Sequence, residues 1–360
     1  MTSLQPHLKA QTLATLQEWL GSIGEPTFRA KQILDWVYAK RVADIGSMLN
    51  LSVKLREQLN TSFRYVALPI ARKTGSHDTT QKILYRLHDG RFIESVLIPA
   101  TPAEFGETSS RRTLCVSSQV GCAYGCKFCA SGLEGFTRNL DASEIVDQIL
   151  QAEKLCGERI QNIVFMGMGE PLANFDNLIR ALEIINSPWG IGLGARHITV
   201  STSGLVPQIR LLAELPLQLR LAISLHAATD EVRAQIMPVN RKYPLEELLD
   251  ACAFWQSRKK QFITFEYILI DRLNDTHAQA HALADHAKRL SAKVNLIPYN
   301  TVEGLPWVRP SEPRQDVFLD ILKARKIQAT IRREKGHDID AACGQLRLRH
   351  ERDLEAPLSA

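Results

Sequence analysis

From residue 113 onward, short apolar strands alternate with amphipathic helices, and this alternation restricts the possible folds more than any other feature of the sequence. Six strands are predicted, at residues 113–117, 162–166, 197–201, 220–224, 263–270 and 293–298. Helices are predicted between them, at residues 142–155, 175–185, 206–215, 245–257 and 276–290. Such repeats form parallel sheets with right-handed crossovers. The sequence therefore predicts an α/β protein, with either an open doubly wound sheet or a barrel that six repeats leave short of eight strands.

Polar or glycine-rich segments follow several of these strands, where the strands end. They are Gly167-Met-Gly-Glu-Pro, Ser201-Thr-Ser-Gly, Ser224-Leu-His and Tyr299-Asn300. In parallel α/β folds the carboxyl ends of the strands build the active site. We therefore expect these segments to converge on one functional site.

The first hundred residues have a different pattern. Helices are predicted at residues 13–20, 28–40 and 53–63, and a hairpin of two alternating strands at 82–87 and 91–98 around His88-Asp-Gly. This part carries 13 Lys and Arg against 8 Asp and Glu, whereas the remaining 260 residues carry 31 of each. We predict a basic accessory domain over 1–100, a core over 101–345 and a tail over 346–360. The basic excess suits nucleic-acid docking, although on charge alone an ordinary solvated surface is the commoner explanation.

Composition places the chain among globular proteins of a reducing compartment. Hydrophobic residues make up 45% of the 360 residues and charged residues 23%. No apolar run is long enough to span a membrane, and the N-terminus lacks a signal-peptide pattern, so we expect a cytoplasmic protein with no membrane association. Four of the seven cysteines lie between residues 115 and 129. In a reducing compartment such crowding indicates metal or redox chemistry.

Three of these cysteines form the segment Cys122-Ala-Tyr-Gly-Cys126-Lys-Phe-Cys129, directly after the first core strand. Three closely spaced thiolates can hold three corners of a [4Fe-4S] cluster, which leaves one iron open to bind a substrate. A structural zinc site is the alternative, but zinc needs a fourth ligand and usually a second cysteine pair. The sequence has no second pair, because Cys156 and Cys252 are isolated on predicted helices, where we interpret them as packing residues.

At this point the sequence resembles the radical S-adenosylmethionine (SAM) enzymes, which have this cysteine spacing and an aromatic residue at the place of Phe128. The segment containing Gly169 and Glu170, one strand–helix unit later, is similar to the motif that contacts the amino group of SAM in that superfamily. The resemblance implies a partial (β/α)6 barrel, a [4Fe-4S] cluster and SAM. Further SAM contacts are implied at the strand ends, at Ser201, Ser224, Leu225, His226 and Asn300. On sequence alone, His226 is equally well explained as a core histidine.

Two further cysteines narrow the resemblance to the RNA adenine methyltransferases of the RlmN and Cfr type. Cys115 lies in Cys115-Val-Ser-Ser-Gln-Val-Gly-Cys122, and Cys343 lies in Gly336-His-Asp-Ile-Asp-Ala-Ala-Cys343-Gly-Gln-Leu. The similarity spans nearly the whole chain and includes Met166-Gly-Met-Gly-Glu-Pro-Leu, Ile223-Ser-Leu-His-Ala and Asn295-Leu-Ile-Pro-Tyr-Asn. Without the resemblance, Cys115 is interpreted as a buried strand cysteine, and Cys343 is interpreted as a tail thiol with no role.

The resemblance implies a mechanism in which Cys343 takes a methyl group from one SAM as a thiolate nucleophile. The radical made from a second SAM removes hydrogen from that S-methyl group, and the methylene radical adds to an adenine carbon. Glu94 is implied as the proton acceptor, although an exposed strand carboxylate is the simpler interpretation of its position. Cys115 then resolves the protein–RNA adduct through a transient disulfide with Cys343, which thiol reduction reopens. Arg332, Arg333 and Lys335 are candidates for phosphate contacts or a solvated charge run.

The implied substrates are 23S ribosomal RNA, at the peptidyl-transferase centre, and tRNA, at the adenosine adjacent to the anticodon. Because the chemistry occurs on a base edge, the adenosine must be unpaired or flipped out. Methylation of C2 is preferred, with Cfr-like methylation of C8 as the alternative. A radical SAM enzyme with a non-RNA substrate and a non-catalytic iron–sulfur RNA-binding protein are the other hypotheses. We expect a flavodoxin-type electron donor and a monomer.

Overall fold

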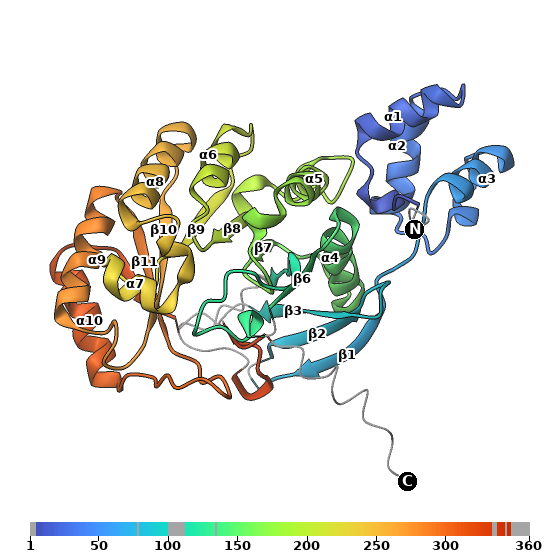
Figure 1. The fold of residues 1–360 in the computed structure, drawn as a ribbon. Coiled ribbons are helices and arrows are strands. Elements are labelled where there is room, and N and C mark those ends of the chain that lie inside the picture. The colour runs from blue at the N-terminus through green and yellow to red at the C-terminus, as the bar shows by residue number, and fades with distance from the viewer. Residues whose placement is uncertain are drawn as a thin grey trace, which may run out of the picture.

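A computed structural model describes residues 5–77, 79–99, 112–133, 135–332, 337–342 and 344–346. Its core is an open ten-stranded sheet in the order β1-β2-β3-β4-β7-β8-β9-β10-β11-β12. Neighbouring strands from β4 to β12 are parallel, whereas β1, β2 and β3 join the sheet in antiparallel pairs. Helices flank the curved sheet along its outer side (Figure 1). The predicted α/β fold with a mainly parallel sheet is confirmed.

The parallel part of the sheet follows the predicted repeats closely. Its strands are β4 (Arg112–Cys115), β7 (Asn162–Phe165), β8 (Ile198–Thr202), β9 (Arg220–Ser224), β10 (Ile263–Leu269), β11 (Lys293–Pro298) and β12 (Ala329–Ile331). Its helices are α4 (Ala142–Cys156), α5 (Phe175–Asn186), α6 (Val206–Glu214), α7 (Asp230–Ile236), α8 (Leu245–Lys259), α9 (His277–Arg289) and α10 (Glu312–Ala324). The six predicted strands and five predicted helices all form, with ends within two residues of the prediction. The elements α7, α10 and β12 are additions, and β12 has only 3 residues, too few for a periodic pattern.

Short helical turns complete the main chain of the described residues. They are η1 (Leu8–Ala10), η3 (Ile45–Ser47), η4 (Ala130–Gly132), η5 (Pro171–Asn174), η6 (Ala195–His197), η7 (Pro238–Arg241) and η8 (His337–Ile339). Most of them lie at the ends of strands or helices, where the chain changes direction.

The N-terminal helices form a separate lobe (Figure 1), made of α1 (Leu13–Ser22), α2 (Arg29–Leu34) and α3 (Val53–Ser62). Helix α1 begins at Thr12, whose side chain and that of Thr15 cap each other's backbone N–H groups. The helix predicted over 28–40 continues from α2 as a π-helical turn, η2 (Asp35–Ala39). The lobe has an apolar core of fully buried side chains, namely Leu16, Leu20, Ile33, Leu34, Leu55 and Leu59.

The predicted hairpin is present as β2 (Gln81–Arg86) and β3 (Phe92–Pro99), and β1 (Ile70–Gly75) adds a third antiparallel strand. Strand β3 pairs with β4, so this hairpin extends the core sheet and does not join the helical lobe. The expected domain boundary near residue 100 falls in segment 100–111, outside the described residues. A division at that point stays a prediction.

Helix α4 connects the helical lobe to the core through buried carboxylates. Lys9 Nζ lies 2.7 Å from Asp147 Oδ1, with both side chains nearly inaccessible to solvent. Arg41 makes a second ion pair with Glu153, and the hydroxyl of Tyr38 donates to the Lys9 carbonyl at 2.6 Å. Because a buried charge is costly unless it is paired, these contacts hold the lobe against one side of α4.

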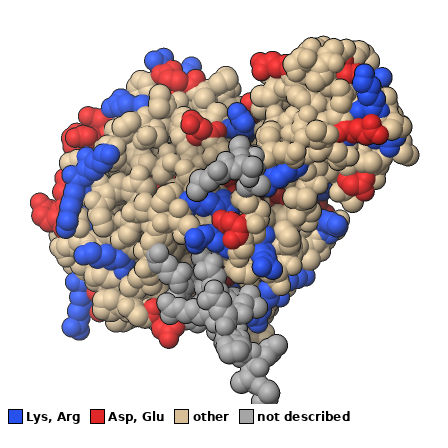
Figure 2. Space-filling view, turned by 45° about the vertical axis from the view of Figure 1, so that its right-hand side comes forward, with Lys and Arg blue, Asp and Glu red and all other residues tan. Residues whose placement is uncertain are grey.

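The surface shows charges of both signs. On the face in Figure 2, acidic side chains lie among basic ones on both lobes. Among the described residues, no helix combines the length and apolar character needed to cross a bilayer.

We predict that the folded state loses stability as pH falls from about 6.5 to about 4. Burial, and then the charge of Lys9, lowers the pKa of His7 from 6.5 to about 4. In this window the unfolded chain binds the proton more readily, so His7 contributes stability above pH 6.5 that is lost below it, at most about 3 kcal/mol. Urea unfolding at several pH values measures the free energy of unfolding. Between pH 6.5 and 4 this free energy should fall less steeply for His7→Gln than for the wild type. An unchanged slope would contradict the prediction, and the exposed His277→Gln is the matched control.

Candidate active site

The carboxyl ends of the parallel strands surround a cavity of about 940 Å³, including the part open to solvent. This volume is in the range of small-molecule sites, about 300–1,000 Å³. The lining includes side chains from the cysteine loop and from the ends of β7, β8, β9 and β10, among them Cys122, Cys126, Cys129, Gly169, Glu170, Ser201, Ser224 and His226. Three of the four segments expected to converge, those beginning at Gly167, Ser201 and Ser224, line this space, whereas Tyr299-Asn300 does not. We call this space the cluster cavity.

The cysteine loop is closed at its base by a small antiparallel pair, β5 (Gln119–Gly121) and β6 (Phe136–Asn139). The N–H of Cys122 donates to the carbonyl of Gly135 at 2.9 Å. Gly121 has a φ of +72°, and a Cβ built there would lie 1.9 Å from the Gly135 carbonyl oxygen. Only glycine therefore permits the close backbone contact that begins the loop.

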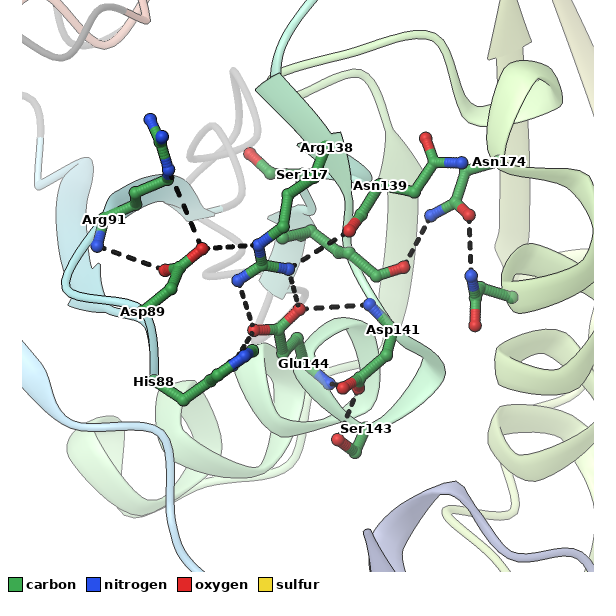
Figure 3. Close-up of polar contacts among 12 residues, drawn as sticks. His88, Asp89, Arg91, Ser117, Arg138, Asn139, Asp141, Ser143, Glu144 and Asn174 are labelled. Carbon is green, nitrogen blue, oxygen red and sulfur yellow. Dashed lines mark hydrogen bonds and ion pairs between the residues drawn. The ribbon is translucent and has the colours of Figure 1, made fainter. Parts of the chain in front are cut away.

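Arg138 on β6 fixes this pair to its surroundings (Figure 3). Its guanidinium donates to the Asp89 carboxylate at 2.6 Å and to both Glu144 oxygens at 2.7 and 2.9 Å. His88 contacts the same Glu144 at 3.2 Å. Asp89 and His88 belong to the turn between β2 and β3, and Glu144 belongs to the first turn of α4. Arg138 therefore connects the base of the cysteine loop to the hairpin and to the core.

The three thiols suit a cluster better than a single metal ion. Cys122, Cys126 and Cys129 all line the cluster cavity, and burial raises the pKa of Cys122 to about 12 and that of Cys126 well above its usual value. In the part of the chain that the structure describes, no three His, Cys, Asp or Glu side chains are grouped to hold one metal ion. Each cysteine of a [4Fe-4S] cluster binds a separate iron, so three spaced thiolates meet its requirement, whereas zinc needs four ligands around one point.

The segment after β7 approaches the chain between β4 and the cysteine loop closely. A Cβ at Gly167 would lie 2.7 Å from the Ser117 Oγ, and a Cβ at Gly169, where φ is +95°, would lie 2.4 Å from the Gln119 Cβ. Glu170 is buried, and its carboxylate accepts from the Ser203 N–H at 2.7 Å and the Leu172 N–H at 3.0 Å. Burial raises the pKa of Glu170, and the hydrogen bonds from Ser203 oppose that shift. The two glycines thus bring a buried carboxylate to the cavity wall.

His226 is held as a neutral ring at the same cavity. Burial, and then the charge of Arg233, lowers its pKa to about 3. Its Nδ1 accepts from the Ile268 N–H at 3.1 Å, so the neutral ring carries its proton on Nε2. The ring also packs edge-to-face on Phe128, with centroids 4.7 Å apart. His226 therefore combines the two interpretations left open by the sequence, because it is a buried ring that also lines a cavity.

The other candidate SAM contacts do not all line the cluster cavity. Ser201 Oγ and Ser224 Oγ lie 3.5 Å apart on neighbouring strands at the cluster cavity. Asn300 instead lines an adjoining cavity, and Leu225 lines neither, although its backbone N–H donates to the Glu266 carbonyl. The structure thus brings five of the seven candidates, Gly169, Glu170, Ser201, Ser224 and His226, to one cavity and places Asn300 next to it.

The adjoining cavity, which we call the thiol cavity, has a volume of about 700 Å³, including solvent-exposed space. It is lined by Cys115 from β4 and by Ala342 and Gly344, the residues on either side of Cys343. Cys343 itself lies outside the described residues. Both cavities share Cys129 and Gly344, so they meet beside the cysteine loop.

The chain around Cys343 is hydrogen-bonded to the end of the cysteine loop and to the segment that follows β11. The Ala130 N–H donates to the Gly344 carbonyl at 2.8 Å, and the Ser131 Oγ donates to the Leu346 carbonyl at 2.8 Å. Gln345 donates to the Thr301 carbonyl at 3.1 Å. These bonds fix the segment that follows Cys343 against the cluster motif.

The remaining candidates lie in different environments. Glu94 is fully buried on β3 and lines neither cavity, which excludes the interpretation as an exposed strand carboxylate. Arg332 lines the thiol cavity, whereas Arg333 and Lys335 lie outside the described residues. Cys252 is fully buried on α8, and Cys156 is half-buried at the end of α4, which agrees with packing positions.

Sequence reasoning missed a fully buried arginine, Arg233 on α7. Its guanidinium donates to the Ser203 carbonyl at 2.6 Å, the Leu225 carbonyl at 3.0 Å and the Asn240 side chain at 2.8 Å. It therefore connects the loop after β8 to the loop after β9, which carries His226. A lone arginine on a short helix gives no sequence signal of burial, because arginine is usually exposed.

We predict that Arg233→Met lowers the free energy of unfolding by about 3 kcal/mol, because several buried acceptors lose their donor. Urea denaturation followed by circular dichroism measures this change. Arg241→Met, at an exposed arginine on the following turn, is the control and should change stability little. Equal stability of the two variants would show that Arg233 does not hold these loops.

Comparisons with known proteins agree with this arrangement. The model of the radical SAM superfamily matches residues 116–284, and the model of the ribosomal RNA large subunit methyltransferase N-terminal domain matches residues 7–64. The first range holds the strands around the cluster cavity, and the second holds the helical lobe.

Full-length relatives are also similar. The chain is 57% identical to a probable dual-specificity RNA methyltransferase RlmN of Akkermansia muciniphila, over 98% of this chain and 99% of that protein. It is 48% identical to a dual-specificity RNA methyltransferase RlmN of Syntrophobacter fumaroxidans, over 94% of this chain and 97% of that protein. The crystal structure of a radical SAM methyltransferase from Sphaerobacter thermophilus superposes with a TM-score of 0.88 at 44% identity, covering 95% of this chain and 99% of that one.

Proposed function

Because this chain belongs to the RlmN family of radical SAM RNA methyltransferases, we propose that it methylates C2 of adenosine in both 23S ribosomal RNA and tRNA. The sites would be the adenosine at the peptidyl-transferase centre and the adenosine adjacent to the anticodon. The observation that carries the proposal is the meeting of two cavities, one at the cluster cysteines and one between Cys115 and the neighbours of Cys343. This arrangement supports radical formation in the cluster cavity and methyl transfer in the thiol cavity.

The cluster cavity supports the binding of both cofactors of the superfamily. Cys122, Cys126 and Cys129 would hold a [4Fe-4S] cluster, whose chemistry is to reduce bound SAM and so supply a carbon radical. Glu170 would accept hydrogen bonds from the amino group of SAM, and Ser201 and Ser224 would offer hydroxyls to its polar groups. The neutral His226 would present Nε2–H as a donor and not as an acid, since its pKa of about 3 keeps the ring uncharged at neutral pH.

Two thiols would carry the methyl group and then release it. The Cys343 thiolate attacks the methyl carbon of one SAM, so a sulfur–carbon bond forms as the sulfonium bond breaks and S-adenosylhomocysteine leaves. After the carbon has joined adenine, the Cys115 thiolate attacks the Cys343 sulfur, and a disulfide forms as the bond to carbon breaks. The electron pair of that bond stays with the carbon, which takes a proton and becomes the methyl group. A dithiol reductant then restores both thiols.

Glu94 would accept the proton that leaves the methylated adenine carbon. It is on the same face of β3 as Val96 and Ile98, because side chains two residues apart point to one side of a strand. Val96 and Ile98 line the thiol cavity with Cys115. A flipped-out adenine in that cavity would thus approach the sheet face that also carries the Glu94 carboxylate.

We expect the reconstituted enzyme to form 2-methyladenosine in unmodified ribosomal RNA and tRNA. The assay combines anaerobic cluster reconstitution, SAM and a reductant with nucleoside mass spectrometry against 2-methyladenosine and 8-methyladenosine standards. Formation of 8-methyladenosine would support the Cfr-like alternative. Deoxyadenosine without either nucleoside would contradict RNA adenine methylation by this chain.

Cys343→Ala should abolish methylation but leave SAM cleavage to deoxyadenosine measurable, because only the methyl carrier is lost. Cys115→Ala should instead retain a covalent protein–RNA adduct, seen as a slow band on a denaturing gel. Cys156→Ala, at a half-buried cysteine outside both cavities, is the control and should behave as the wild type. Undiminished methylation by Cys343→Ala would rule out the S-methylcysteine route.

A further inference from the structure

A buried lysine, Lys82, lies beside Glu94 inside the sheet. In the antiparallel register of β2 and β3, Lys82 is opposite Val96, so its side chain shares one face of the sheet with Val96 and with Glu94, two residues earlier. Lys82 Nζ lies 3.2 Å from Glu94 Oε1, and the two side chains are 11% and 1% exposed. Lysine is seldom buried unless it is paired, and the ion pair with Glu94 meets that condition. A buried ion pair at this position therefore suggests a role besides packing.

Lys82 also contacts the segment that leads to Cys343. Its Nζ donates to the carbonyl oxygen of Asp340 at 3.5 Å. The turn between β1 and β2 binds the same segment, because the Ser76 hydroxyl and the His77 N–H both donate to the Asp338 carboxylate. Strand β2 and the turn before it therefore hold residues 338–340, which directly precede two lining residues of the thiol cavity, Ala341 and Ala342. Of these contacts, the one made by Lys82 also joins Glu94 to this segment.

We propose that Lys82 is a positioning residue that keeps Glu94 ionised and fixes it relative to the Cys343 segment. The inference rests on the proposed function, since it takes Glu94 as proton acceptor and Cys343 as methyl carrier. Among the described residues, Lys82 itself lines neither cavity, so it acts through Glu94 and not on the substrate.

The physical reason is the cost of a charge at a fully buried position. A carboxylate without exposure to water favours its neutral form unless a positive charge lies close to it. The Lys82 ammonium supplies that charge, and only the ionised form of Glu94 can accept a proton. When the C–H bond of the adenine adduct breaks, its proton moves to Glu94 and its electron pair stays in the ring. The unpaired electron that radical addition left in the adduct would return to the cluster, which had supplied one electron to cleave SAM. Radical formation and methyl loading of Cys343 do not use Glu94, so loss of the Lys82 charge does not block either step.

Because Lys82 is needed for the proton transfer to Glu94, Lys82→Met should stop the reaction after the protein–RNA adduct has formed. We expect methyladenosine formation to fall by about 10²-fold, the lower end of the effect of an acid–base group. Deoxyadenosine formation in the first turnover should stay within about twofold of the wild type, and the covalent protein–RNA adduct should accumulate, as in Glu94→Gln. Lys82→Arg should recover a large part of the rate, because it restores a positive charge at the pair.

The experiment uses the reconstituted full chain with unmodified ribosomal RNA. It measures deoxyadenosine, methyladenosine and the adduct for the wild type, Lys82→Met, Lys82→Arg, Glu94→Gln and the double variant Lys82→Met/Glu94→Gln. Lys73→Met, at an exposed lysine on the neighbouring strand β1, is the matched control. Because Lys82 acts through Glu94, the double variant should be no slower than Glu94→Gln alone.

The outcomes separate the inference from the proposed function. If Glu94→Gln arrests at the adduct and Lys82→Met does not, the role of Lys82 is overturned while the proposed function stands. If the losses of methyladenosine formation add up in the double variant, Lys82 has only a structural role. The same conclusion follows if Lys82→Met and Lys82→Arg both lose methyladenosine formation and both have a lowered unfolding temperature. If the wild type forms deoxyadenosine but no methyladenosine, the proposed function fails, and the inference that depends on it falls with it.

Discussion

The structure depends on parallel pairing of the core strands, because parallel strands all end at the same edge of their sheet. Chain segments far apart in sequence, from the cysteine loop to the end of β10, therefore meet around the cluster cavity. Close backbone contacts refine this convergence. At Gly121 and Gly169 a side chain would collide with the opposing strand or loop, so glycine lets the cysteine loop and the Glu170 segment approach the cavity. Arg233 then holds the loops after β8 and β9 from behind the cavity wall.

A second set of interactions connects the accessory elements to this core through α4. Its carboxylates Glu144, Asp147 and Glu153 are buried, and each has a basic partner from another part of the chain: Arg138, Lys9 and Arg41. The helical lobe, the hairpin and the base of the cysteine loop thus share one helix as their support. The hairpin in turn binds the segment before Cys343, while the cysteine loop binds the segment after it. The described residues on both sides of Cys343 are therefore held by elements that α4 fixes.

The sequence predicted the core elements well because their periodicity is strong and their lengths are ordinary. The same reasoning missed β12, which has 3 residues, and the β5–β6 pair, whose short strands flank the cysteine motif. It also gave no reason to single out Lys82 or Arg233, because a lone basic residue is expected to be exposed to solvent. Their burial follows from register and from loop packing, which are properties of the assembled sheet. For Glu94 the sequence favoured exposure, whereas the structure buries it beside Lys82 of β2.

The sequence by itself determined the α/β class, the position of the strand ends and the chemistry of the cysteine motif, because periodicity and ligand spacing are local properties of the chain. The resemblance carried by Cys115 and Cys343 added the methyl-transfer chemistry. Only the tertiary structure decided which candidates share a cavity, that His226 is neutral, and that a buried lysine accompanies Glu94. These properties arise from desolvation and from contacts between residues distant in sequence, and both exist only after the sheet, its helices and the hairpin have packed together.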